Sequence, residues 1–447
     1  MTVGADFPAR LHAWLDRHHP GSEPIALAYS GGGDSHALLC IAAEWARARG
    51  SELHALTVDH DLRPDSGAEA RRAVDAARRL GARAEVLCWR GDKPEHGLQA
   101  AARQARHALL AETCRARHIT QLLLAHTRDD QAETVWMRLQ AGAGWRGLAA
   151  MAERVASPVW PQGRGVEILR PLLDLRRTDL RDYLTATGER WIDDPSNQDR
   201  RYARIRARQR LGTLEMAGLK TERLAVLARD LGAIDRNERL IAAAIAREAV
   251  RFHPWGGAQL DVGRLSRTAP VIRRRLIETL ALAISGRAAP ARRSGLDGLV
   301  EQVLHQGPGS AAGVQTMRWR GGSWMFRDPG AVLGRVDHPG SKSLDVQPGT
   351  AQVWDGRYEI ETSLVNIIAE PLGTGYRRDG ARCDLETIPG PARTGLLALR
   401  CDGEVLAIAG VRHDSGVRIA PLMEQRFHSR LLCEPAFQPG LEHPAPA

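Results

Sequence analysis

The chain has 447 residues, of which 43% are hydrophobic and 26% charged, and its formal net charge is +9. This length is too great for one hydrophobic core, and the positive balance favours a polyanionic partner. No apolar stretch approaches a membrane span and the N-terminus shows no basic-then-apolar leader pattern, so we expect a cytoplasmic protein with no membrane partner.

The first part of the chain alternates strand and helix patterns. Apolar runs predict strands over 25–29, 52–58, 85–89 and 121–125, and each is followed by a segment with helical spacing. This order predicts an α/β fold with a parallel, doubly wound, Rossmann-like sheet. Because such sheets bind ligands at the carboxyl ends of their strands, we expect three polar clusters to converge there. These clusters are 30–35, 59–63 and 126–133.

The cluster after the first strand has the sequence Ser-Gly-Gly-Gly-Asp-Ser over residues 30–35, and it opens a helix. Glycines let backbone N–H groups approach an anion, and the first helical turn adds further N–H groups, so this turn predicts a phosphate site. It is not a Walker loop, because none of the three lysines follows a loop of that kind. Asp34 would repel phosphates by itself, which favours a Mg²⁺ ion between them. A glycine-rich turn without a ligand is the alternative.

His126, Asp129, Asp130 and Glu133 form a second cluster, between a strand end and the next helix. Asp129 is expected to cap that helix. Asp130 and Glu133 are three residues apart and would share a helix face toward the site. Asp130 is therefore the first candidate for metal binding or proton transfer, with Glu133 and His126 in support. A cap followed by a solvated helix face is the alternative.

Beyond residue 210 the pattern changes. Residues 218–285 have helical periodicity, whereas short alternating segments after a turn-rich break at 338–350 predict β-structure. We therefore expect three domains, at 1–215, 216–337 and 338–447, with the second helical and the third mostly β. The six cysteines show no Cys-x-x-Cys spacing, so we expect them to be reduced and mostly buried, and neither metal ligands nor disulfide-bonded.

Residues 30–35 resemble the S-G-G-x-D-S signature of the PP-loop ATP pyrophosphatases. Further motifs resemble, by their order and spacing, one branch of that superfamily, the tRNA(Ile)-lysidine synthetases. The resemblance is dense from about residue 25 to 210 and weaker beyond. The motifs that carry it are VDHDLR at 58–63, AARQARH at 101–107, GAGWRGL at 142–148, LRPLL at 169–173 and WIDDPSN at 191–197.

The resemblance implies a two-step reaction. ATP adenylates the C2 oxygen of the wobble cytidine in a minor isoleucine tRNA with a CAU anticodon, and pyrophosphate leaves. The ε-amino group of free L-lysine then attacks C2 and expels AMP, which gives lysidine. ATP and Mg²⁺ are the implied cofactors. The first domain would bind ATP, while the second and third would bind and select the tRNA.

The resemblance also implies roles for individual residues. Asp34 and Asp130 would bind Mg²⁺, Asp59 would lie near adenine and ribose, and Arg106 or Arg103 would neutralise the α-phosphate. The residues expected to cradle the departing phosphates are Ser30, Gly31, Gly32, Gly33 and Ser35. The residues of the basic run 200–210 expected to contact the tRNA backbone are Arg201, Arg204, Arg206 and Arg208. A solvated basic helix is the alternative for that run.

The attacking lysine must be neutral. From a reference pKa near 10.4, its deprotonation at pH 7 costs about 4–5 kcal/mol, so a base or a carboxylate-lined pocket is needed. Asp130, Glu133 and His126 are the candidates, and the sequence does not rank them.

Some positions depart from the family pattern. Asp61 stands for a glycine, which puts the conformation of its turn in doubt. Thr127 stands for a second histidine, so only His126 is left with a chemical role there. Ile205 replaces an asparagine of the basic run, and the loop 141–144 lacks an arginine.

Two other kinds of function are alternatives for this sequence. A tRNA thiolase of the same superfamily would need catalytic cysteines or an Fe–S site, and the scattered cysteines argue against both. A non-catalytic nucleotide- or RNA-binding protein of this fold is the alternative from another class. The presence of Asp34, Asp130 and Glu133 counts against it.

Overall fold

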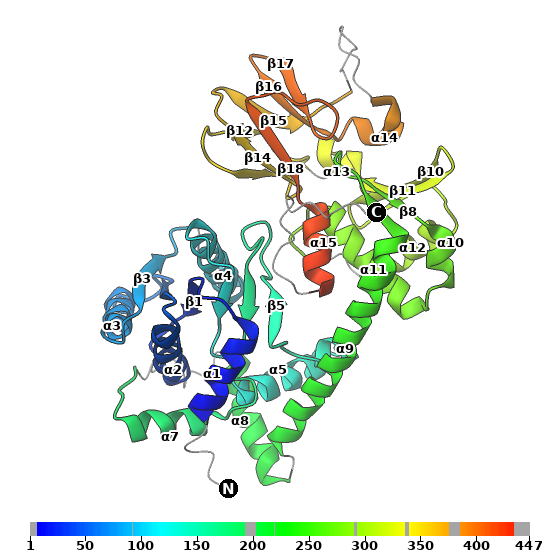
Figure 1. Cartoon of the computed structure of the whole chain (residues 1–447). Helices are drawn as coiled ribbons and strands as arrows, with labels where there is room; N and C mark the ends of the chain where they lie inside the picture. The colour runs from blue at the N-terminus through cyan, green and yellow to red at the C-terminus, as the bar shows by residue number, and fades with distance from the viewer. Residues whose placement is uncertain are drawn as a thin grey trace, which may run out of the picture. The chain divides into compact units, whose positions relative to one another are not determined.

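The computed structural model describes residues 7–91, 93–192, 203–218, 220–289, 293–335, 339–374 and 385–432. The described chain divides into two compact units, one up to Asn237 and one over Glu238–Leu432 (Figure 1). Each unit is described by itself. Among the described helices, none combines the length and the apolar character that crossing a membrane requires.

A six-stranded sheet forms the centre of the first unit, in the order β3-β2-β1-β4-β6-β5. All neighbouring strands pair in parallel except β5, which is antiparallel to β6. The predicted parallel, doubly wound α/β sheet is therefore confirmed. The chain order turns back between β1 and β4, which is where such sheets form their ligand crevice. The strands are β1 Ile25–Ala28, β2 Leu53–Asp59, β3 Arg83–Cys88, β4 Gln121–Leu123, β5 Arg154–Ala156 and β6 Glu167–Leu169.

Helices cover both faces of this sheet because its strands are apolar on both sides (Figure 1). Successive side chains of a strand alternate between the faces. Ile25 and Leu27 belong to a core with α1, α2, α3 and α7, whereas Ala26 belongs to a core with α4. The helices are α1 Phe7–His18, α2 Gly33–Arg49, α3 Ser66–Arg79, α4 Leu98–Ala116, α5 Arg128–Gln140, α6 Trp145–Leu148, α7 Arg177–Thr187, α8 Ala203–Met216 and α9 Thr221–Ala249, the last of which continues into the second unit.

The second unit begins with helices around a five-stranded antiparallel sheet of order β7-β8-β11-β10-β9. The helical character of this part is confirmed, but its sheet was not predicted, since strands of three to six residues carry too few positions to show a period of two. The strands are β7 Val250–Phe252, β8 Ala258–Leu260, β9 Gly309–Ala311, β10 Val314–Trp319 and β11 Gly322–Arg327. The helices are α10 Val262–Arg267, α11 Pro270–Ile284, α12 Arg293–Leu304 and α13 Pro329–Leu333.

The C-terminal part consists of two small antiparallel sheets, β12-β15-β16-β17 and β13-β14-β18, which confirms its predicted β character. Its last helix packs against α11: Phe427 enters the core of the helical part, and the buried Arg426 donates to the carbonyl oxygen of Leu282 at 2.8 Å. The elements are β12 Leu344–Val346, β13 Gln352–Trp354, β14 Tyr358–Thr362, β15 Ile367–Pro371, η2 Leu385–Thr387, α14 Gly390–Arg393, β16 Leu397–Cys401, β17 Glu404–Ile408, β18 Val417–Pro421 and α15 Met423–Leu432.

Candidate active site beside the phosphate loop

The glycine loop between β1 and α2 is braced by its two serines. Ser35 Oγ donates to the carbonyl oxygen of Gly32 at 2.9 Å and lies 3.1 Å from Ser30 Oγ. The backbone N–H of Ser30 donates to Ser35 Oγ at 3.3 Å. Gly32 caps α2 without any side-chain hydrogen bond, so the N–H groups of the first turn remain directed out of the helix. This geometry suits an anion at the start of α2.

Gly31 is required where it stands. Its φ of +82° lies in the left-handed region, and a Cβ atom there would come within 2.8 Å of Ile192 Cδ1. The N–H of Ile192 donates to the carbonyl oxygen of Gly31 at 2.9 Å, and Trp191 lies against Gly33. The motif at 191–197 therefore begins as a wall of the phosphate loop, while its residues from 193 onward lie outside the described part of the chain.

Arg177, the first residue of α7, joins the two predicted clusters. Its guanidinium binds Asp34 at 3.2 Å, Asp130 at 2.5 Å and Glu133 at 2.9 Å. Leu180 and Leu184, both fully buried in the core beside α2, hold the helix that carries it. The structure thus brings together the three predicted carboxylates around a cation that the sequence analysis did not single out. Arg177 follows the motif at 169–173 by four residues, which is the signal that could have identified it.

The charges in this carboxylate cluster (Asp34, Asp130 and Glu133) are strongly coupled. Burial raises the pKa of Asp34, and Arg177 only partly offsets that effect. Burial would also raise the pKa of Asp130, but the charges of Arg177 and Arg204 and the hydrogen bond from the N–H of Thr127 hold it below its usual value. Burial would lower the pKa of Arg177, yet the carboxylates around it raise it. The cluster is therefore built to hold positive charge.

The start of α5 corrects one prediction. Thr127, and not Asp129, caps the helix, because its Oγ1 accepts from the N–H of Asp130 while Asp130 Oδ2 accepts from the N–H of Thr127 at 2.9 Å. Threonine can make this capping box because its hydroxyl lies within reach of the third residue of the helix. Asp129 instead accepts from the N–H of Arg177 at 3.0 Å and so fixes the start of α7.

His126 is buried. Its Nδ1 accepts a hydrogen bond from Nε of Arg170 at 3.2 Å. Burial, together with the positive charge of Arg170, lowers the pKa of His126 well below its usual value. An imidazole in this setting is a poor proton acceptor near neutral pH.

A group of arginines lies at the same edge of the site. Burial and the charges of Arg103 and Arg204 lower the pKa of Arg106 to about 10, and burial with Arg103 and Arg138 lowers the pKa of Arg170 to about 10. Among the described residues, Nε of Arg106 has no hydrogen-bond partner. Cations that depress one another's pKa values in this way would be stabilised by an anion.

Asp59 ends β2, beside β1. Its Oδ1 accepts from the N–H of Asp61 at 2.8 Å, and Asp61 adopts a φ of +50°. Asp61 therefore takes the left-handed conformation that a glycine would favour at this turn. Lys93 supports it by donating to its carbonyl and carboxylate oxygens, at 2.7 and 3.0 Å.

The basic run forms α8, and its arginines differ in position. Arg208 binds Glu133 at 2.9 Å and Arg204 lies 3.7 Å from Asp130, so both form ion pairs with the carboxylate cluster. Arg206 and Arg210 are exposed, as is Arg208. Ile205 and Ala207 are buried and anchor the helix, and Arg201 lies outside the described residues. The Asn-to-Ile departure at 205 thus serves packing.

A cavity of about 240 Å³ lies elsewhere in the first unit, between α1, α5 and α9. It is lined by Arg10, Arg128 and Glu222 among others, and it includes neither the glycine loop nor the carboxylate cluster. It is therefore separate from the candidate site.

Comparison with known proteins agrees with this geometry. The family model described as PP-loop domain matches residues 7–215. The tRNA(Ile)-lysidine synthase of Caulobacter vibrioides is 36% identical over 433 residues, which are 94% of this chain and 96% of that protein. The chain belongs to the tRNA(Ile)-lysidine synthase family. The family member from Hyphomonas neptunium is 40% identical over 68% of this chain and 80% of its own length, and that from Ruegeria pomeroyi is 36% identical over 82% and 83%.

Proposed function

We propose that this chain ligates L-lysine to C2 of the wobble cytidine in an isoleucine tRNA with a CAU anticodon, at the expense of ATP. One observation carries the proposal: the phosphate loop of a PP-loop domain lies beside the carboxylate cluster. The negative charge of its three carboxylates could bind both a metal cation and a basic amine. The C2 oxygen of cytidine attacks the α-phosphorus and pyrophosphate leaves. The lysine amine then attacks C2, loses a proton, and expels AMP.

In this proposal, the loop and the arginines bind different phosphates of ATP. Ser30, Ser35 and the glycine N–H groups would hold the departing β- and γ-phosphates at the start of α2. Arg106, whose Nε has no partner among the described residues, would bind the α-phosphate together with Arg103. Asp59, at the end of the neighbouring strand β2, would lie near adenine and ribose.

The carboxylate cluster fits Mg²⁺. Asp34 and Asp130 supply the hard oxygen donors that this ion prefers, and both already hold one cationic group, the guanidinium of Arg177. Bound there, Mg²⁺ would neutralise charge on the phosphates. The guanidinium of Arg177 binds the same two carboxylates in this structure. When the ion binds, Arg177 must therefore give up some or all of these contacts.

Glu133 is our candidate for the base that takes the proton of lysine. Its Oε1 is bound by Arg177 and Arg208, while its Oε2 has no partner among the described residues. Asp130 is less suited, because one of its oxygens caps α5 and the other binds Arg177. His126 is less suited because Arg170 already donates to it and its pKa is low.

The exposed side of α8 and the chain beyond it would bind and select the tRNA. The positive net charge and the exposed Arg206 and Arg210 support a contact with a nucleic-acid backbone. We keep the division into a catalytic part, a helical part and a β-rich part as a proposal for how these roles are distributed. With a tRNA as its substrate, we propose that the protein acts in the cytoplasm.

The test separates the two chemical steps. The wild-type chain, supplied with ATP, Mg²⁺ and the isoleucine tRNA, should release pyrophosphate and incorporate labelled lysine. Asp34→Asn should lose both activities by at least about 10²-fold, because a metal ligand is removed. Glu133→Gln should still release pyrophosphate but lose lysine incorporation by about 10²–10⁴-fold.

Lysine incorporation that does not depend on ATP, or none at all by the folded wild-type chain, would contradict the function. Equal loss of both steps in Glu133→Gln would contradict only the assignment of Glu133 as the base.

A further inference from the structure

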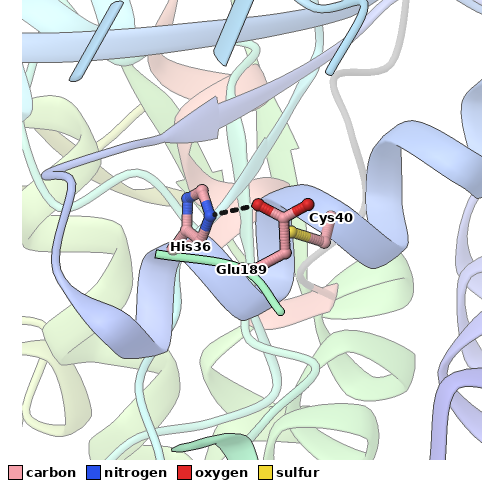
Figure 2. Close-up of side chains that lie close together, drawn as sticks. All are labelled: His36, Cys40 and Glu189. Atoms are coloured by element: carbon pink, nitrogen blue, oxygen red, sulfur yellow. Dashed lines mark hydrogen bonds and ion pairs between the residues drawn. The ribbon is translucent and has the colours of Figure 1, made fainter. Parts of the chain in front are cut away.

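Three side chains of metal-ligating type meet at the start of α2, and none of them belongs to the carboxylate cluster. His36 and Cys40 lie one turn apart on α2, and Glu189 follows α7 (Figure 2). One ligand atom from each lies within 4.8 Å of the others. His36 Nε2 is 3.2 Å from Glu189 Oε2. His36 and Cys40 are buried, whereas Glu189 is partly exposed and leaves a path to solvent.

A fourth residue orients the histidine. The hydroxyl of the buried Tyr29 lies 2.9 Å from His36 Nδ1. This contact leaves Nε2 as the nitrogen that faces Glu189. A ligating histidine in a metal site is held by such a hydrogen bond at its other ring nitrogen, so the arrangement already contains an outer-shell contact.

We propose that His36, Cys40 and Glu189 form a binding site for a Zn²⁺ ion, distinct from the Mg²⁺ site proposed above. Thiolate, imidazole and carboxylate together suit this borderline-soft ion, and three protein ligands leave one position open for water. Tetrahedral bonds of ~2.0–2.3 Å place ligand atoms roughly 3.3–3.6 Å apart. The histidine and glutamate atoms, 3.2 Å apart, are close to this spacing, and the Cys40 sulfur, within 4.8 Å of them, has to approach by roughly 1.2 Å or somewhat more.

Zinc in this position would connect the helix that follows the phosphate loop with the segment that packs against the loop. His36 and Cys40 belong to the helix that the loop opens, and Glu189 lies three residues before Ile192, whose N–H binds Gly31. The absence of Cys-x-x-Cys spacing predicted no metal ligand among the cysteines. A ligand set of one cysteine, one histidine and one carboxylate from a distant segment has no such local pattern.

Cobalt substitution tests the proposal on the purified full-length chain. Addition of Co²⁺ after treatment with a chelator should give a thiolate-to-cobalt charge-transfer band in the near ultraviolet and tetrahedral bands in the visible, and Zn²⁺ should displace them at one ion per chain. Cys40→Ser, His36→Gln and Glu189→Gln should each lose the charge-transfer band or the tetrahedral bands. Tyr29→Phe should weaken Co²⁺ binding by about 10–100-fold.

Cys114→Ser is the matched control, because Cys114 is an equally buried cysteine outside the site, and it should keep the full spectrum. Circular dichroism checks the folding of each variant, and Glu189→Gln, at a partly exposed position, keeps the test valid if a buried variant fails to fold. A wild-type chain without the charge-transfer band would overturn the proposal. So would an unchanged spectrum in folded Cys40→Ser or Glu189→Gln; His36 would then only hydrogen-bond Tyr29 and Glu189.

Discussion

Arg177 shows how one residue can organise a site without belonging to any motif that the sequence makes obvious. Its guanidinium holds carboxylates from α2 and α5, and its backbone N–H is bound by Asp129. In the absence of a bound cation, it compensates three negative charges that would otherwise repel one another. A divalent ion at the same carboxylates would supply two positive charges in place of one.

Replacement of Arg177 by Met should therefore destabilise the chain in a chelator by about 3 kcal/mol, because it leaves buried carboxylates unpaired. Millimolar Mg²⁺ should restore much of the lost stability in this variant, while its effect on the wild type is small. Thermal unfolding with and without Mg²⁺ measures both effects. Arg176→Met is the control, since the exposed pair of Arg176 with Asp179 should contribute little. If Mg²⁺ gave no selective rescue, Asp34 and Asp130 would not be metal ligands.

At the level of single positions, two departures from the family pattern prove conservative in structure. Asp61 adopts the left-handed conformation expected of the glycine it replaces, with support from Asp59 and Lys93. Thr127 replaces a histidine and caps α5. Both replacements keep the backbone in place, so the site geometry tolerates them.

Among the elements, α8 combines two roles on different faces. Buried Ile205 and Ala207 pack it against the first unit, and this places Arg204 and Arg208 beside the carboxylates of α5. These two arginines form ion pairs with the carboxylates of the site, although the side chain of Arg208 is also 46% exposed. Arg206 and Arg210 remain exposed and are the better candidates for contacts with RNA phosphates.

The double substitution Arg206→Gln and Arg210→Gln should weaken tRNA binding and make it less dependent on salt. Each lost phosphate contact lowers the slope of log K against log salt by ~0.7–0.9, so two contacts should lower it by roughly 1.4–1.8. ATP affinity should not change. The slope is measured by titrating tRNA binding at several salt concentrations. Arg72→Gln with Arg78→Gln on α3 removes the same charge elsewhere and serves as the control. An unchanged slope in the α8 variant would show that Arg206 and Arg210 make no contact with RNA phosphates and that this face of the helix is only solvated.

Taken as a whole, the molecule consists of two units with separate cores. The sheet of the first unit has its own apolar layers on both faces, while α15 and α11 join the helical and β-rich parts of the second. All the groups proposed to bind ATP and Mg²⁺ belong to the first unit. The expected boundary at residue 215 lies within α8, whereas the first compact unit continues to Asn237.

ATP with Mg²⁺ should therefore slow amide hydrogen exchange in the first unit and leave residues 238–432 nearly unchanged. At a ligand concentration of 100 times Kd, binding stabilises the native state by about 2.7 kcal/mol. Protection should be greatest at the glycine loop and at the start of α5. Mass spectrometry on the full chain locates the amides whose exchange is slowed. The variant Asp34→Asn is the control and should show no such protection by ATP and Mg²⁺. Equal protection in both units would contradict a nucleotide site confined to the first.

The sequence by itself determined the parallel sheet, the phosphate loop and the carboxylates, because these features depend on local patterns. Strand and helix periods, a glycine run at a strand end, and acidic residues three apart are all visible within a few neighbouring positions. Only the tertiary structure decided which charges meet. Arg177, Arg204 and Arg208 approach the carboxylates through packing of α7 and α8. Glu189 reaches His36 across 153 positions of the chain, and no local pattern specifies such a contact.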